Sequence, residues 1–242
     1  MKRLLILFVF VALSLPMSAD AAIGFVSTTT AVNPASNTVA YDATATNGYL
    51  VVQTLKQSSQ TVTGVTYNSV AMTQLTTIQG NTAAETLYLW GLAAPTTGTN
   101  DIVVSVSGAG TLVVDVALYS GAQQTTAVEA TSTNSGIDAT SASVTVTTIT
   151  DNDWLVGYFR SNSGSGAFTA GANTVVRGDA ANGTRQMVDT GADQTPAGSK
   201  SLNVTMALAA NWSAMAFALK PTAAAPSAAT PILSLVKAFW LF

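Results

Sequence analysis

Tyr49-Leu-Val-Val-Gln-Thr-Leu-Lys56 opens a series of short apolar segments that continues to Gly121. This octapeptide has apolar residues on both faces of an extended chain, which is typical of a strand buried on both sides. Further segments rich in β-branched and aromatic residues follow it, each bounded by turn residues. They are residues 70–78, 86–92, 102–107 and 111–120. The series predicts packed antiparallel strands, around which the rest of the chain is arranged.

Two tight connections are predicted within the series. Asn68-Ser69 should turn a hairpin over residues 62–75, because Asn tolerates the left-handed conformation that such turns require. Gly108-Ala-Gly110 should close a second hairpin, between residues 102–107 and 111–119. Alternation within residues 111–119 puts Asp115 on one face of the expected strand and a set of core residues on the other. The core residues are Leu112, Val114, Val116 and Leu118.

The flanking sequence extends the same pattern. Residues 23–32, 141–150 and 154–160 should be strands, whereas the polar residues 121–140 predict a loop. Residues 202–208 and 212–220 should form a last hairpin, joined at 209–211. Since the body shows no helical periodicity, the sequence predicts an all-β fold. We expect a single-domain antiparallel β-sandwich, jelly-roll-like, over residues 22–220.

Four segments, in this order, resemble the landmarks of a β-sandwich module found in many bacterial and phage secreted or surface proteins. They are Gly64-Val-Thr-Tyr-Asn-Ser-Val-Ala-Met-Thr73, Leu89-Trp-Gly-Leu-Ala-Ala-Pro-Thr-Thr-Gly98, Ser120-Gly-Ala-Gln-Gln-Thr-Thr126 and residues 212–221. The resemblance covers most of residues 24–221 and implies a fold. It implies no catalytic residues, because that family carries no catalytic signature to transfer. Ser69 stands where the usual pattern has Gly after the hairpin Asn.

The first 21 residues have the three parts of a secretory signal peptide. Lys2 and Arg3 precede an apolar run over residues 4–15, and Ala19-Asp20-Ala21 supplies the small residues of a cleavage site. The run is shorter than the roughly 20 residues that a membrane-spanning helix needs. An uncleaved N-terminal anchor is the alternative. We expect cleavage after Ala21 and an extracellular or cell-surface location.

Composition excludes several classes of function. The chain has no His and no Cys, which excludes a Ser-His-Asp triad, His-ligated zinc, thiolate catalysis and disulfides. Removing residues 1–21 leaves 7 basic and 11 acidic residues, a net charge of −4. The remaining Lys and Arg residues are scattered, whereas nucleic-acid binding normally needs clustered cations. We therefore expect neither an enzyme nor a nucleic-acid-binding protein.

Two acidic groups are candidate sites. Asp151 and Asp153, with Asp138, are candidate calcium ligands, because calcium takes several oxygen ligands. The alternative is that they cap a turn; no cofactor is otherwise expected. Asp189 and Asp193 have the form of an acid pair for glycoside hydrolysis, but 11 carboxylates produce such spacings by chance.

Aromatic residues are the candidate ligand-binding residues. Tyr88 and Trp90 should share one strand face, as should Trp154 and Tyr158, and exposed rings stack on sugars. Burial in the core is the favoured alternative, because both strands are apolar on both faces. Trp212 begins the last expected strand opposite to its core residues, which predicts an exposed rim.

An apolar tail follows the body. Residues 221–231 form a Pro/Ala/Thr/Ser linker, and residues 232–242 carry a single charge, Lys237. Eleven residues are too few to span a bilayer as a helix. The alternatives are a segment folded back on the body, an interfacial or partner-binding anchor, and a sorting signal. The candidate assembly or anchoring residues are Ile232, Leu235, Phe239, Trp240 and Phe242.

These features predict an exported, non-catalytic module of a cell surface or extracellular matrix that acts by adhesion or self-assembly. The alternative is a carbohydrate-binding module that uses exposed aromatic residues. The partners expected are further copies of the chain or a surface, reached through the tail, or a glycan.

Overall fold

The computed structural model describes residues 22–57, 60–80, 84–162, 167–179 and 184–223. These residues are almost entirely strands, arranged in three antiparallel sheets, with one short 3₁₀ turn at Ala35–Asn37. The predicted all-β antiparallel fold is therefore confirmed. It has three stacked sheets, whereas a single β-sandwich has two. No helix in the described part of the chain is long and apolar enough to cross a membrane.

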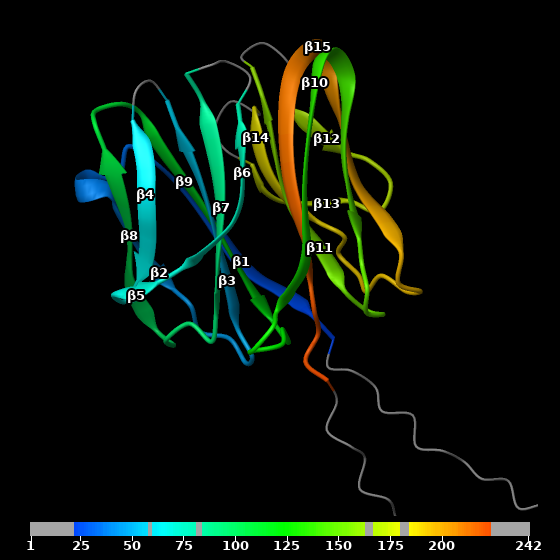
Figure 1. The fold of residues 1–242 in the computed structure, drawn as a ribbon, viewed down its shortest axis with the longest axis horizontal. Coiled ribbons are helices and arrows are strands. Elements are labelled where there is room, and N and C mark those ends of the chain that lie inside the picture. Colours follow the sequence, from blue (N-terminus) through cyan, green and yellow to red (C-terminus); the bar gives the residue numbers. More distant parts are fainter. Residues whose placement is uncertain (1–21, 58–59, 81–83, 163–166, 180–183, 224–242) are drawn as a thin grey trace, which may run out of the picture.

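The three sheets lie side by side in Figure 1. The central sheet has the order β1-β9-β3-β7-β6, which are Gly24–Val32, Leu112–Ser120, Tyr49–Lys56, Thr86–Ala93 and Thr73–Gln79. The outer sheet has the order β2-β8-β4-β5, which are Thr38–Asp42, Thr99–Ser107, Thr61–Tyr67 and Val70–Ala71. The third, which we call the curled sheet, has the order β10-β15-β11-β14-β13, with β12 also paired to β15. Its strands are Val128–Thr147, Ser199–Leu219, Trp154–Ser161, Arg185–Asp189, Val175–Asp179 and, for β12, Phe168–Ala170.

The central sheet is buried on both faces, as the sequence of β3 and β9 predicts. One face packs against the outer sheet through Leu50, Val52, Val114 and Val116, all of which are inaccessible to solvent. The other face packs against the curled sheet through residues of opposite parity; they are Tyr49, Val51, Val113, Ala117 and Tyr119. Two apolar layers therefore hold the three sheets together.

The curled sheet adds a third apolar layer by bending over itself. Strands β10 and β15 have 20 and 21 residues and pair along their whole length, with register shifts between Gly136 and Ser141. Leu202, near the start of β15, packs in the same cluster as Ala216 near its end and Leu155 of β11. The two ends of one strand therefore meet across a shared core.

Three connections differ from the predicted ones. Residues 209–211 do not turn a hairpin but continue β15 through its bend, and residues 121–140 contain the whole first half of β10. The short link Gly108–Gly110 does not close a hairpin either, because β8 pairs in the outer sheet and β9 in the central one. Strand β9 is apolar on both faces, so it packs between β1 and β3, where both faces are covered.

The hairpin turn at Asn68 and Ser69 is confirmed. Both residues have positive φ angles, 48° and 65°, and β4 pairs with β5 on either side of them. Two successive positive φ angles are the pattern of a two-residue turn that follows the right-handed twist of its strands.

Candidate functional site

The predicted ligand-binding aromatic residues are buried. Tyr88, Trp90, Trp154 and Trp212 are at most 9% exposed, and Tyr158 is inaccessible. The indole of Trp90 donates to Thr54 Oγ1, that of Trp154 to Asp193 Oδ1 and the hydroxyl of Tyr158 to Asp115 Oδ2. The interpretation of these rings as core residues is therefore correct, and the prediction that Trp212 lies on an exposed rim is wrong. Trp212 is covered because β15 bends at this point, which the sequence pattern does not show.

The three candidate calcium ligands do not form one site. Asp138 is exposed at the bend of β10, where its backbone N–H donates to Asn211 Oδ1. Asp153 lies far from this bend. It precedes Trp154, which pairs with Leu219, the last residue of β15. Asp151 accepts from the backbone N–H of Ala197. No group of three or more acidic residues suited to a metal ion occurs in the described part of the chain.

Asp153 instead lies beside Glu129 in a buried acidic pair. Glu129 accepts from the backbone N–H groups of Ile149 and Thr150, and Lys220 Nζ is 3.1 Å from its Oε1. Burial by itself raises the pKa of Glu129, but hydrogen bonds, first of all from Thr150, lower it to about 2. Burial and then the neighbouring Glu129 carboxylate raise the pKa of Asp153 to about 8. Asp153 is therefore protonated in the folded protein at neutral pH.

This pair predicts that the protein loses stability as the pH rises toward about 8. Between pH 3.8, the ordinary pKa of aspartate, and about 8, the folded chain holds a proton on Asp153 that the unfolded chain releases. The melting temperature should therefore be higher near pH 5 than near pH 8.5. Asp153→Asn, which cannot titrate, should reduce that difference in thermal melts. Asp101→Asn, which changes an exposed carboxylate on β8, should leave it unchanged.

The buried carboxylate of Asp115 links the central and curled sheets. Asp115 of β9 accepts from Thr30 Oγ1 at 2.6 Å and Tyr158 Oη at 2.8 Å, and burial raises its pKa. It lies opposite to Val116, as predicted, but its own face is buried as well. These polar contacts join β1 and β9 of the central sheet to β11 of the curled sheet, so Asp115 has a structural position.

The candidate hydrolytic acid pair, Asp189 and Asp193, is also used inside the structure. Asp189 is inaccessible and accepts from Arg177 Nε at 2.7 Å, Tyr119 Oη at 3.1 Å and the backbone N–H of Gly191. Burial raises the pKa of Asp189, against the effect of Arg177. Asp193 is exposed and accepts from the indole N–H of Trp154, so the two carboxylates have separate partners and separate surroundings.

The structure brings together a different set of residues, between the edge strand of the central sheet and that of the curled sheet. Strand β6 pairs only with β7, and β10 only with β15, among the described strands. The two strands run close to each other, and partly exposed apolar side chains lie between them; these are Leu75 and Ile78 of β6 and Val128 of β10. We call this line between β6 and β10 the seam.

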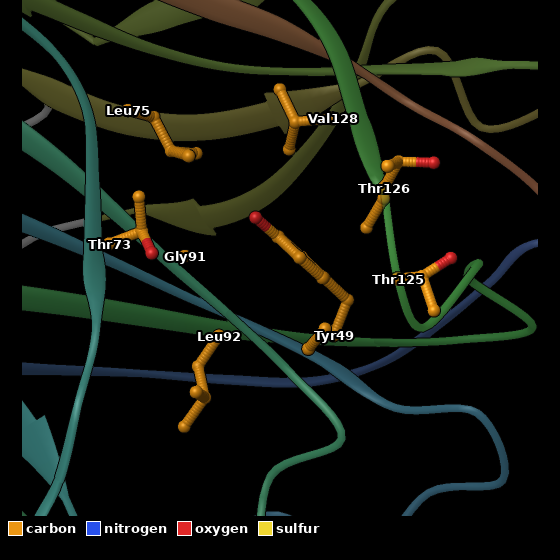
Figure 2. A pocket seen from close by; sticks show the side chains of 10 residues that line it. Tyr49, Thr73, Leu75, Gly91, Leu92, Thr125, Thr126 and Val128 are labelled. Carbon is orange, nitrogen blue, oxygen red and sulfur yellow. The ribbon is translucent and has the colours of Figure 1, made fainter.

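A pocket of about 240 Å³ opens at one end of the seam. Its walls include Leu75 and Val128, with threonines at its rim (Figure 2). The hydroxyl of Tyr49 points into it, toward Leu75 and Val128. Tyr49 is 4% exposed, and burial raises the pKa of its hydroxyl. The pocket thus combines apolar side chains, threonines and the hydroxyl of Tyr49.

Gly91 makes room for the Tyr49 ring. A Cβ atom at this position would lie 2.0 Å from the Tyr49 hydroxyl oxygen, so a side chain here would displace the ring. Tyr49 pairs with Ala93 and Val51 with Gly91, which places the ring over the glycine two residues along the neighbouring strand. An aromatic residue next to a strand glycine was the only signal in the sequence for this pocket.

A second pocket, of about 280 Å³, lies at the other end of the seam. Ile78 and Gly80 line one side, and Gly136, Ile137 and Trp212 the other. Ile137 is 81% exposed, and the indole Nε1 of buried Trp212 has no acceptor among the described residues. Both ends of the seam therefore combine apolar side chains with a polar group, and at the second pocket Trp212 Nε1 is buried without an acceptor, which costs stability until a partner is supplied.

The two ends of the described chain leave the body near the first pocket. The Ala22 carbonyl packs against Gly121, whose φ of 73° and close approach leave no room for a side chain. The backbone N–H of Thr222 donates to Gly121 O, and that of Lys220 to Ala127 O, which lines the pocket. Pro221 and Thr222 thus belong to the body, and the linker begins later than predicted.

The expected signal peptide, residues 1–21, and the tail candidates Ile232, Leu235, Phe239, Trp240 and Phe242 lie outside the described residues. No protein-family model, curated protein or solved structure matches the chain. Function is therefore inferred below from the residues and contacts of this protein.

Proposed function

We propose that this protein is an exported, non-catalytic structural module that acts at the cell surface or in an extracellular matrix by self-assembly or adhesion. The leader pattern of residues 1–21 supports export. The absence of His and Cys from the sequence supports a role without nucleophilic or metal catalysis of the usual kinds. The resemblance to modules of secreted and surface proteins points the same way.

The use of polar and aromatic side chains in the body also supports a structural role. The candidate rings Trp90, Trp154 and Trp212 are packed between strands, so they offer no platform for a sugar. The carboxylates of Asp115 and Asp189 hold neighbouring sheets together. These side chains stabilise the stack of sheets, and glycan binding through the predicted rings finds no support in their positions.

The observation that carries the proposal is the composition of residues 232–242 beside a body that already has three apolar layers. Among the residues that the structure describes, those that form these layers all precede residue 222. Apolar surface left in water costs about 25 cal/mol per Å², so eleven nearly uncharged residues favour a surface that covers them. We infer that a neighbouring copy supplies this cover and that the tail is the means of assembly.

Deleting residues 224–242 should abolish assembly and leave the body folded. In sedimentation velocity experiments, the mature chain 22–242 should form species larger than a monomer, and the chain ending at Ala223 should be monomeric. The melting temperatures of the monomeric bodies should agree, because the body has three apolar layers formed among residues 22–223. A matched variant of unchanged length, with Leu235, Phe239 and Trp240 replaced by Ser, should behave as the truncated chain does. Assembly that survives both changes would contradict the proposal.

A further inference from the structure

The seam has the features of a binding site for an extended apolar segment. Leu75, Ile78 and Val128 are partly exposed along it, although each packs against the core between the central and curled sheets. None of the residues that line its two pockets is charged. A segment that fills the seam would complete an apolar layer that already exists instead of creating a new one.

Strands β6 and β10 lie too close together to admit a strand between them, but each has one backbone edge with which a further strand can pair. Strands β6 and β10 each end a sheet, and neither has a partner on its outer edge among the described strands. An edge strand presents a row of unpaired N–H and C=O groups, and an extended peptide that pairs with them adds main-chain hydrogen bonds to side-chain burial.

Resting on the proposed function, we propose that the seam is the docking site for residues 232–242 of a neighbouring copy. This segment is apolar at both parities of an extended chain except for Ser234 and Lys237. Such a pattern suits a strand that is covered on both faces. Lys237 lies near the middle of the segment, and its long side chain can reach water from a covered strand.

The lengths agree. Eleven extended residues span about 36 Å, and the part of β10 from Val128 to Gly136, between the two pockets, has nine residues and spans about 30 Å. The docked segment can therefore reach both pockets. In the first pocket an indole N–H, which Trp240 provides, can donate to the Tyr49 hydroxyl oxygen. In the second, a backbone carbonyl of the segment can accept from Trp212 Nε1.

The linker favours a neighbouring copy over the same chain. The chain leaves its own body at Thr222, beside the first pocket. A segment that docked in its own seam would need only a short turn, whereas nine residues, 223–231, separate Thr222 from Ile232. Nine residues span up to about 30 Å, and Pro226 and Pro231 favour an extended chain. A linker of this length can span the distance between two bodies while the tail of each docks in the seam of the other.

Disulfide trapping tests the site, because the chain has no cysteine of its own. One population carries Thr73→Cys, at an exposed residue of β6 that lines the first pocket, and another carries Ala238→Cys in the tail, which keeps the large apolar residues intact. Mild oxidation of a mixture of the two mature chains should give a disulfide-linked heterodimer. The matched control replaces Thr73→Cys with Thr61→Cys, at an exposed residue of β4 in the outer sheet. We expect roughly tenfold more heterodimer with the seam variant, since docking raises the local thiol concentration from micromolar toward millimolar.

A single chain with both Thr73→Cys and Ala238→Cys distinguishes the source of the segment. Disulfide-linked dimers and larger species should form, and disulfide-linked monomers should be rare. A predominance of linked monomers would overturn docking between copies, and equal yields for Thr73→Cys and Thr61→Cys would overturn the seam as the site. In the second case, loss of assembly on deletion of the tail would still support the proposed function, so the two failures are distinguishable.

Discussion

Val116→Asp should prevent folding or destabilise the protein severely. Val116 is inaccessible in the apolar layer between the central and outer sheets, and neighbouring strands β1 and β3 pair on both sides of β9. An unpaired carboxylate in such a layer costs several kcal/mol, a large share of the roughly 5–15 kcal/mol that stabilises a typical domain. Denaturant unfolding followed by circular dichroism measures the loss.

Val103→Asp is the matched control for this substitution. Val103 lies on β8, is 38% exposed, and would keep its new carboxylate in contact with water. Its cost should be about 1 kcal/mol or less. Similar losses at the two positions would mean that the face of β9 assigned to the core is wrong.

Arg177→Leu should have the next largest effect. The Arg177 side chain is 21% exposed, and its guanidinium is the cation that pairs with the inaccessible Asp189 carboxylate. It also lies 4.6 Å from the centre of the Phe25 ring, so it joins β13 to β1 at the edge of the stack. Removing one partner of a buried ion pair typically costs about 3–5 kcal/mol; because Arg177 is partly exposed, we expect about 2–3 kcal/mol.

A second substitution separates the charge from the packing. Adding Asp189→Asn to Arg177→Leu removes the unpaired carboxylate, keeps an oxygen that accepts from the Gly191 N–H, and places an amide N–H₂ that can donate to the Tyr119 hydroxyl oxygen. The double variant should recover part of the lost unfolding free energy in the same denaturation experiment. If the double variant is less stable than Arg177→Leu alone, the ion pair is not the source of the effect.

The strands of the central sheet could be predicted because their signal is local. Strands β3 and β9 have apolar residues at both parities, and only a strand with a layer on each face buries both sets. The turn at Asn68 and Ser69 could be predicted for a similar reason, since the conformation depends on the two residues themselves.

The curled sheet could not be predicted in the same way. The first half of β10 is mostly Thr, Ser, Asn and Ala, and only pairing with β15 makes it a strand. Residues 209–211 look like a turn, yet β15 passes through them, because its two ends are held in one shared core. The burial of Trp212 follows from this bend, which no window of the sequence contains.

The seam depends on how two sheets are placed, so no segment of sequence could show it. Thr73 to Ile78 read as an ordinary strand, and Val128 lies in a region that predicted a loop. Only the stacking of the central sheet on the curled sheet brings them together. The apolar tail, by contrast, is evident from composition alone, whereas the seam that we propose as its binding site could be identified only from the structure.

Amide hydrogen exchange of residues 232–242 at two protein concentrations tests most directly whether a neighbouring copy covers the tail. At the higher protein concentration the chains are assembled, and at the lower one the assemblies have dissociated. Tail amides should exchange slowly in the assembled sample and rapidly in the dispersed one, because cover by another copy is lost on dilution. Equal protection at both concentrations would show that the body of the same chain covers the tail, and rapid exchange at both would show that no copy covers it.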